Sequence, residues 1–479
     1  MRIGQTSFVV FVSQLLSSLL GFAATLYFAR VVGAEVLGYY ALTILVAKWL
    51  MLGGEAGVSS AIKKRISEQN EPSAHLTAGL VTLAVLGVVS TLAVAAFQGV
   101  VNSYVGTDVH LLVVLLVLAG FVGSAVTAAL EGESRVHVSG LLSPVRFGSR
   151  SLIQIGLVFA GFGLTGMLLG YAGGGLVAGL IGAFFVSTRF QWPRIEHFRN
   201  LFDFAKFSWL GNLSGRSFND VDVFVLGALV SPALVGVYAI AWNITQFIGV
   251  FGSSIRQSTF PELSNASVTE RTNAVTGIVS DSLAYSGLFA IPGFFGSVVL
   301  ADRLLTLYGS EFARGATVLA LLVVSMIVWD YMNQLLNTLN AIDRPDRSFR
   351  VNVAFIATNL GLNVVLVLAL GWIGAAIATL IATLVGIVLA FYYLSSLVRF
   401  EVPFGEIARQ VVAASTMAVV VYAVRRGIES MDLLNHNAAI VVILVSLGAA
   451  TYFLVLATIS DRFRATLVDN SPVRIPFLS

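Results

Sequence analysis

The sequence contains no cysteine, and this absence excludes disulfides, thiolate metal sites and cysteine nucleophiles. Charged residues are scarce, at 11% of the 479 residues, whereas about a quarter is usual in soluble proteins. The GxxxxGK(S/T) motif of ATP-binding proteins is missing, and the five histidines form no HxxxH or HExxH pair. We therefore expect no enzyme activity, no catalytic residues, no cofactor and no metal site.

Apolar residues make up most of the chain instead. The hydrophobic share is 57% and the mean hydropathy is +0.89. A helix needs about 20 residues to cross a bilayer core of about 30 Å, and apolar runs of that length recur, each closed by polar or basic residues. This pattern predicts an all-α polytopic membrane protein with about 14 transmembrane helices. The expected spans are residues 7–29, 39–61, 76–98, 110–130, 140–162, 164–186, 204–227, 236–257, 276–300, 316–339, 350–370, 373–396, 406–424 and 438–459.

Basic residues are distributed unevenly between the two ends of these spans. An even number of spans places both termini on one side, and the side richer in Lys and Arg is cytoplasmic. The basic residues on the side of the termini are Lys63, Lys64, Arg65, Arg135, Arg146, Arg189, Arg194, Arg199, Lys206, Arg256, Arg271, Arg344, Arg347, Arg350, Arg399, Arg409, Arg462, Arg464 and Arg474, against Arg30, Arg303, Arg314, Arg425 and Arg426 on the other. We therefore expect a multi-pass protein of the cell membrane with both termini in the cytoplasm. This distribution also explains the net charge of +3 without a nucleic-acid partner.

An internal repeat is visible at an offset of about 198 residues. Residues 32–41 match residues 230–239, and residues 163–168 match residues 371–376 at nearly the same offset. The first match superposes Gly38 on Gly236 and Tyr40 on Tyr238. Because six spans separate the equivalents, the repeats are parallel, as in transporters built from two halves.

This repeat predicts two six-helix lobes that form a V-shaped cleft, with two further helices outside them. The expected domains are residues 1–200 for the N-lobe (helices 1–6), 201–397 for the C-lobe (helices 7–12), and 398–479 for helices 13–14 and a cytoplasmic tail. Such an architecture suits alternating access.

Several short motifs resemble the polysaccharide biosynthesis, or Wzx-type, lipid-linked oligosaccharide flippases of the multidrug/oligosaccharidyl-lipid/polysaccharide superfamily. The motifs are Ala29-Arg30-Val31-Val32-Gly33 with Gly38-x-Tyr40, Ser231-Pro232 with Gly236-x-Tyr238, Phe260-Pro261-Glu262-Leu263-Ser264, Asn359-x3-Asn363 and Gly374-Ala375-Ala376-x-Ala378-Thr379. The lipid II flippase and the multidrug MATE antiporters are more distant members. Arginine greatly outnumbers lysine, which is typical of haloarchaeal or high-GC organisms. The composition is therefore compatible with an archaeal N-glycosylation flippase.

The resemblance implies a translocase that moves a polyprenyl- or dolichyl-linked sugar from the cytoplasmic to the outer leaflet. The sugar and phosphate would pass through a polar central cavity while the lipid tail stays in the bilayer. Expected partners are this lipid-linked sugar, membrane lipids and glycan-assembly enzymes, and the expected state is a monomer. Fourteen spans favour the flippase branch over the MATE proteins with their twelve.

Ionisable residues at membrane depth identify candidate binding positions, because such residues usually face a cavity or a partner. Helix 7 carries Arg216 and Asp220 four residues apart and so on one face, with Asn212 one turn before them. Arg216 is a candidate for holding a phosphate oxygen, with Asp220 controlling its availability. The alternative is a local ion pair that lets the helix insert.

Helix 2 and its repeat equivalent supply the other candidates. Lys48 lies at mid-span and corresponds to Gln246 of helix 8, with Asn243 close by. These residues could line the cavity opposite Arg216, although Lys48 could equally extend its side chain to the membrane surface. For ion coupling the candidates are Asp330 on helix 10 and Glu55, which lies in a glycine-rich stretch of helix 2.

Two alternative functions remain on the sequence alone. A cation-coupled, MATE-like antiporter of small molecules would depend on Asp330 or Asp220 and not need Lys48 and Arg216. Asp220-Val221-Asp222 also matches the DxD motif of sugar transferases, but it lies inside an apolar run and no soluble domain accompanies it.

Overall fold

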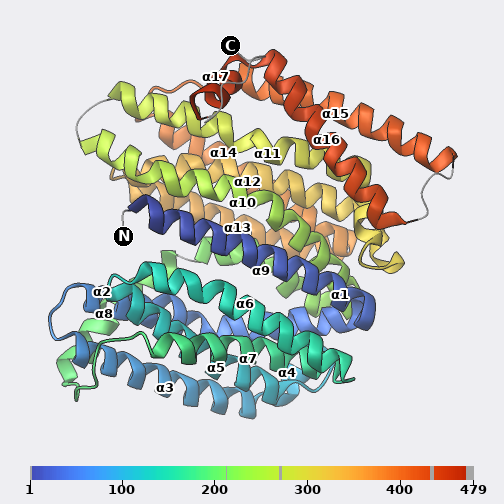
Figure 1. Cartoon of the computed structure of the whole chain (residues 1–479). Coiled ribbons are helices and arrows are strands. Elements are labelled where there is room, and N and C mark those ends of the chain that lie inside the picture. Colours follow the sequence, from blue (N-terminus) through green and yellow to red (C-terminus); the bar gives the residue numbers. More distant parts are fainter. Residues whose placement is uncertain (1–2, 212, 269–271, 432–435, 471–479) are drawn as a thin grey trace. The chain divides into compact units, whose positions relative to one another are not determined.

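The computed structural model describes residues 3–211, 213–268, 272–431 and 436–470, and these residues form helices and no strand (Figure 1). They divide into two compact units, Met1–Ala239 and Ile240–Ser479. The all-α class predicted from the sequence is confirmed.

Unit 1 contains nine α-helices, the first turns of a tenth and one π-helix among its described residues. They are α1 (Ile3–Leu52), η1 (Gly53–Ser59), α2 (Ser60–Ser67), α3 (Pro72–Ala96), α4 (Gln98–Val105), α5 (His110–Gly132), α6 (Val136–Phe159), α7 (Gly163–Ala183), α8 (Ile195–Gly211), α9 (Leu213–Leu229) and the start of α10 (Pro232–Val268). Residues between α7 and α8 form an extended connector.

Helix α1 is a long helical run broken at a single residue. Gly33 has φ 78° and ψ 176°, a conformation open to glycine but strained for other residues. The two predicted spans 7–29 and 39–61 therefore follow each other with only a kink between them. The glycine-rich stretch around Glu55 forms the π-helix η1.

Two glycines allow α1 and the start of α10 to pass backbone against backbone. A Cβ atom on Gly38 would overlap the carbonyl oxygen of Pro232, and one on Gly236 would overlap the carbonyl oxygen of Ala34. The predicted repeat superposes Gly38 on Gly236 and Ala34 on Pro232, so the two segments contact each other reciprocally. Only glycine fits at both crossing positions.

Helices α5, α6 and α7 pack side by side in unit 1 (Figure 1). Glycines on α7 make the approach close, because a Cβ atom on Gly170 or Gly174 would overlap α6 at Gln154 or Arg150. Small residues of this kind drive helix association where the surrounding lipid is as apolar as the side chains.

Unit 2 contains the rest of α10 and seven further α-helices among its described residues. They are α11 (Thr272–Thr306), the 3-10 helix η2 (Ser310–Gly315), α12 (Ala316–Ala341), α13 (Pro345–Leu370), α14 (Trp372–Ser395), α15 (Phe404–Ser430), α16 (Asn437–Ile459) and α17 (Asp461–Asn470).

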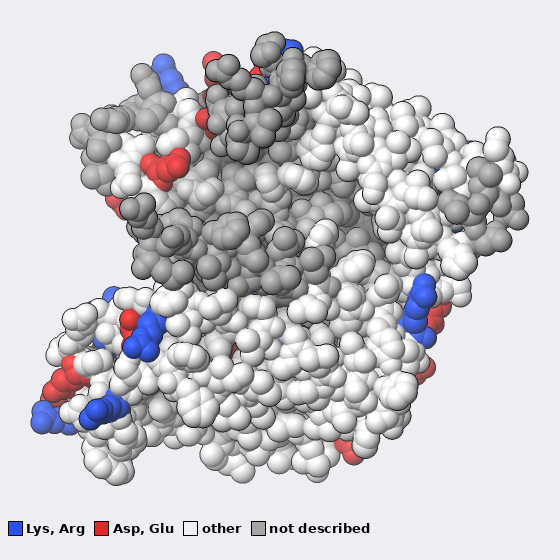
Figure 2. Space-filling view, in the orientation of Figure 1, with Lys and Arg blue, Asp and Glu red and all other residues white. Residues whose placement is uncertain are grey.

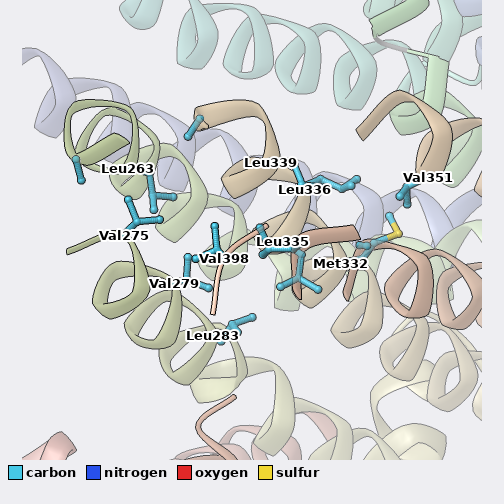
Figure 3. Packing of buried hydrophobic residues seen from close by; sticks show 14 residues of the cluster. Leu263, Val275, Val279, Leu283, Met332, Leu335, Leu336, Leu339, Val351 and Val398 are labelled. Atoms are coloured by element: carbon cyan, nitrogen blue, oxygen red, sulfur yellow. The ribbon is translucent and has the colours of Figure 1, made fainter. Parts of the chain in front are cut away.

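A hydrophobic core joins α10, α11, α12 and α13 in unit 2 (Figure 3). Leu335, Leu336 and Leu339 of α12 lie between Leu263 of α10 and Val351 of α13, all at most 4% exposed. A second cluster packs α15 and α16 against α11. Between α13 and α14, Asn359 donates a hydrogen bond to Thr379 over 3.0 Å, so these buried polar groups hold the two helices together.

Eleven helical segments of the described residues are long and apolar enough to cross a membrane. Each of the fourteen predicted spans overlaps helical residues, and the difference from eleven has two sources. Leu20–Ser67 counts once although it contains the predicted span 39–61 and part of 7–29, and neither α6 nor the α8–α9 segment is counted. Figure 2 shows that on the face in view the charged side chains of unit 1 lie toward its edges, with a broad uncharged stretch between them.

Candidate functional site

Four charged side chains predicted from the sequence come together in unit 1. Arg216 of α9 lies 3.1 Å from Glu55 of η1 and 3.6 Å from Asp220 on its own helix. Lys48 of α1 lies 4.0 Å from the other oxygen of Asp220. We call Lys48, Glu55, Arg216 and Asp220 the charge network.

Local structure explains why these residues meet. Arg216 and Asp220 are one helical turn apart on α9, which places both side chains on one face. Glu55 projects from the π-helix, whose extra residue per turn rotates the side chains that follow relative to those of α1. The backbone of η1 also contacts α8, where Gly57 faces Ala205.

The charge network is only partly shielded from solvent. The Asp220 side chain is 9% exposed and that of Arg216 20%, whereas those of Glu55 and Lys48 are 32% and 41% exposed. Breaking a buried ion pair leaves an uncompensated charge and is costly. The more exposed members can exchange partners more readily, because water or a ligand reaches them.

Two arginines in the middle of α6 were missed as candidates. Arg146, one of the basic residues on the side of the termini, is the eleventh residue of α6, and Arg150 is the fifteenth. Their four-residue spacing inside an expected span is the sequence signal that would have found them.

Arg150 is held by neutral groups. Its guanidinium donates a 2.6 Å hydrogen bond to the Tyr40 hydroxyl and lies 4.1 Å from the centre of the Tyr171 ring. Gln154 also donates to Tyr40, over 3.1 Å, and to the carbonyl oxygen of Met167. Tyr40 of the Gly-x-Tyr motif thus positions a cation.

The second Gly-x-Tyr motif holds an anion instead. The Tyr238 hydroxyl donates a hydrogen bond to Asp222. Asp222 is only 2% exposed, so the motif fixes this carboxylate inside the helices of unit 1.

The remaining candidates belong to unit 2 or lie outside the described residues. Asp330 of α12 is 2% exposed and lies 2.6 Å from Arg256 of α10. On α10, Asn243 is exposed and Gln246 is half-buried. Asn212 lies outside the described residues. Gly252 of α10 lets Asp330 approach, because a Cβ atom there would overlap its carboxylate.

Asp330 has an acceptor neighbour one turn away on α12. The Oδ2 atom of Asp330 and the Oε1 atom of Gln334 are both buried, and neither has a hydrogen-bond partner among the described residues. Buried acceptors without a donor, one helical turn apart, can take up a proton or a small cation. No group of three or more His, Cys, Asp or Glu in the described part of the chain could hold a metal ion.

Outside the spans, the connector between α7 and α8 is fastened by two carboxylates. Glu133 accepts hydrogen bonds from the backbone and side chains of Ser187 and Thr188. Burial alone would raise the pKa of Glu133, but these hydrogen bonds outweigh it and hold the pKa below its usual value. At the start of α8, His197 lies 2.6 Å from Glu71 and lowers the pKa of that carboxyl.

Apolar helices around charged groups held at membrane depth define a multi-pass membrane protein of the transporter class. Comparison with known proteins refines this class. A family described as "Polysaccharide biosynthesis protein" matches residues 3–267, and one described as "Lipid II flippase MurJ" matches residues 138–443. The chain belongs to the polysaccharide biosynthesis protein family.

Two curated relatives come from Haloferax volcanii. "Probable flippase AglR" is 32% identical over 97% of each chain. "Probable low-salt glycan biosynthesis flippase Agl15" is 27% identical over 90% of this chain and 92% of the relative. The sequence-based family resemblance is thus confirmed.

Solved structures share the fold. The lipid II flippase MurJ in an inward closed conformation has a TM-score of 0.81 at 15% identity, covering 96% of this chain and 100% of MurJ. A multidrug MATE transporter in an inward-facing conformation has a TM-score of 0.66 at 18% identity, covering 81% of this chain and 98% of the transporter. The fold is therefore MurJ-like.

Proposed function

We propose that this protein is a flippase that moves a polyprenyl- or dolichyl-linked sugar from the cytoplasmic to the outer leaflet for cell-surface glycan or glycoprotein assembly. The observation that carries the proposal is the charge network at membrane depth, in a chain whose relatives are named as flippases for glycan biosynthesis. A lipid-linked sugar needs such a place, because its phosphate cannot cross the apolar core unaided.

The geometry supports a mechanism based on exchange of ion partners. Without substrate, Glu55 and Asp220 neutralise Arg216 and Lys48. A phosphate that enters would compete for the Arg216 guanidinium, which can bind two phosphate oxygens at once. The displaced carboxylates would then be free to pair elsewhere or to take up a proton. Binding of the headgroup and rearrangement of α9 relative to η1 are thus linked.

Coupling to an ion is proposed at Asp330, with Glu55 as a second candidate. Asp330 offers one carboxylate oxygen to Arg256 and another without a hydrogen-bond partner in the described part of the protein. Protonation of that second oxygen would turn it into a donor toward an acceptor such as Gln334. A proton or Na⁺ at this position would weaken the pair with Arg256.

The second candidate function is a cation-coupled antiporter of small molecules. The observation in its favour is the structural similarity to the MATE transporter, which is weaker than that to MurJ. This function would need Asp330 or Asp220 and would tolerate neutral residues at Lys48 and Arg216.

We propose that the protein lies in the cell membrane with both termini in the cytoplasm, as the distribution of basic residues indicates. It would act as a monomer beside glycan-assembly enzymes. Residues 1–200 and 201–397 would form its two lobes, and residues 398–479 would add the last two helices and the tail. Asn243 and Gln246 on α10, and Asn212, are proposed to contribute polar groups to the sugar path.

The test is depletion of the protein in its host, followed by mass spectrometry of lipid-linked sugars in each leaflet. Lipid-linked sugar should accumulate in the cytoplasmic leaflet after depletion. Expression of the wild-type protein should return its amount to normal, whereas expression of Arg216→Ala should not. Arg199→Ala, an exposed arginine of α8, is the matched control and should complement fully. Unchanged lipid-linked sugars after depletion would instead favour the antiporter.

A further inference from the structure

We infer that the primary anchor for the anionic part of the substrate is the arginine pair of α6, Arg146 and Arg150, rather than the charge network. This inference rests on the proposed function, since it takes the substrate to be a phosphate ester of a lipid. It assigns distinct roles to two groups of cations in unit 1.

The first argument is charge balance. Both cations of the charge network, Lys48 and Arg216, already have a carboxylate within 4.0 Å. Neither Arg146 nor Arg150 has a carboxylate within that distance anywhere in the described part of the chain. The positive charge that awaits an anion is therefore on α6.

The second argument is depth. At about 1.5 Å per residue, Arg146 and Arg150 lie about 15 and 21 Å from the start of α6. If α6 crosses a bilayer core of about 30 Å, as the expected span 140–162 implies, both arginines lie well inside that core. A charge without a counterion is costly at such depth, and it persists where it faces a cavity and has a use. Extension of both side chains to the membrane surface does not explain the fixed position of Arg150.

The third argument is preorganisation by neutral partners. Tyr171 and Tyr40 fix the Arg150 guanidinium without cancelling its charge. The Tyr40 oxygen accepts hydrogen bonds from both Arg150 and Gln154, which leaves its own hydrogen for a further acceptor. The cluster thus offers donors and a positive charge, which suits a phosphate oxygen.

The fourth argument is space beside Arg146. A small open cavity between α5, α6 and α7, which lie side by side in Figure 1, has a volume of about 70 Å³. Its lining includes Arg146 together with Thr127, Ser139 and Ser143. Hydroxyl groups and a guanidinium are the side chains that bind phosphate esters, and Arg146 is exposed enough to reach one.

The arrangement gives the two groups of cations an order of action. The phosphate binds first to Arg146 and Arg150, which have no carboxylate within 4.0 Å in the described part of the chain. An anion held there would then compete with Glu55 and Asp220 for the Arg216 guanidinium. Binding on α6 is in this way transmitted to the charge network.

The test measures binding of farnesyl phosphate to the purified full-length protein in nanodiscs, with farnesol as the uncharged probe of equal tail length. Arg146→Gln and Arg150→Gln should each weaken farnesyl phosphate binding about ten- to a hundredfold and leave farnesol binding unchanged. Arg150→Lys should recover part of the loss, and Arg199→Gln should behave as wild type. Arg216→Gln should weaken binding less than either α6 variant.

The outcomes separate the inference from the proposed function. If Arg216→Gln abolishes binding while both α6 variants bind normally, the anchor is the charge network and the inference is wrong. If the wild-type protein does not distinguish farnesyl phosphate from farnesol, the proposed function itself fails. Thermal unfolding of each variant shows whether a loss of binding is caused by a loss of folding. Tyr40→Phe keeps both arginine charges, removes the hydroxyl that contacts Arg150, and should bind farnesyl phosphate several-fold more weakly.

Discussion

Among single residues, Gly38 and Gly236 have the least tolerance for change. Gly38→Ala or Gly236→Ala would place a methyl group on a carbonyl oxygen of the opposing segment, which the backbone cannot avoid by a change of rotamer. We expect each substitution to lower the stability of the protein by about 1–3 kcal/mol or more. Thermal unfolding in detergent measures this, and Gly215→Ala, with open space around it, should have a much smaller effect.

The pair of Arg256 and Asp330 is a second residue-scale test. The Asp330 side chain is 3% exposed and that of Arg256 22%, so Asp330→Ala leaves a half-buried arginine without its partner and should destabilise the protein by about 1–3 kcal/mol. Replacing both residues, as Arg256→Met with Asp330→Leu, should restore most of that stability because no charge is left unpaired.

Transport by this double variant distinguishes structure from coupling. A stable double variant that has lost pH- or Na⁺-dependence of transport supports Asp330 as the coupling site. A double variant that transports with unchanged ion dependence would reduce the pair to a packing role.

The sequence predicts charged residues better than it predicts their partners. The spacing of Arg216 and Asp220 was enough to place them on one face, and the structure confirms that pair at 3.6 Å. Their contacts with Glu55 and Lys48 join residues more than 160 positions apart, which no local pattern reports. Arg146 was grouped with the basic residues on the side of the termini because it lies near an end of the expected span, and α6 begins four residues earlier than that span.

Among the structural elements, the connector between α7 and α8 should respond to acid. Because the pKa of Glu133 is lowered in the folded protein, its contribution to stability is complete above the ordinary value of 4.5 and is lost as the pH falls through the lowered pKa. The protection of residues 184–194 from hydrogen exchange, relative to the intrinsic rate at each pH, should therefore fall below pH 4.5. Glu133→Gln should show low protection at neutral pH and little further change in acid, and protection that does not change with pH in the wild type would contradict the assignment.

Helix boundaries could be predicted only where the local signal is strong. Long apolar runs such as α14 and α16 match their expected spans within a few residues. The π-helix η1 was not predicted, because glycines promote several backbone conformations and only the packing against α8 selects one. The break in α1 at Gly33 likewise needed the structure, since glycine in an apolar run is also compatible with an uninterrupted helix.

For the whole molecule, the absence of cysteine makes the membrane orientation simple to measure. Ser67→Cys lies at the end of α2 and Ser310→Cys in η2, and both positions are exposed. With cytoplasmic termini, a membrane-impermeant maleimide added to intact cells should label Ser310→Cys and spare Ser67→Cys until the cells are opened. The reverse pattern would invert the proposed orientation.

The sequence also predicted the class of the whole molecule, because the number and length of apolar runs constrain a membrane protein more tightly than a soluble one. The repeat and the lobe boundaries at 200 and 397 stay predictions. The reciprocal contact of Gly38 and Gly236 is nonetheless the kind of contact that a duplicated segment makes with its copy.

The unpaired arginines of α6 have an electrical consequence. A protein that rearranges with an empty site carries the charges of Arg146 and Arg150 through part of the transmembrane field, whereas a bound phosphate cancels one or both. Each full elementary charge that crosses contributes about 2.3 kcal/mol per 100 mV. The voltage across the membrane would then act on the return of the empty carrier more than on the movement of the loaded one, and would set a direction for transport without any ATP.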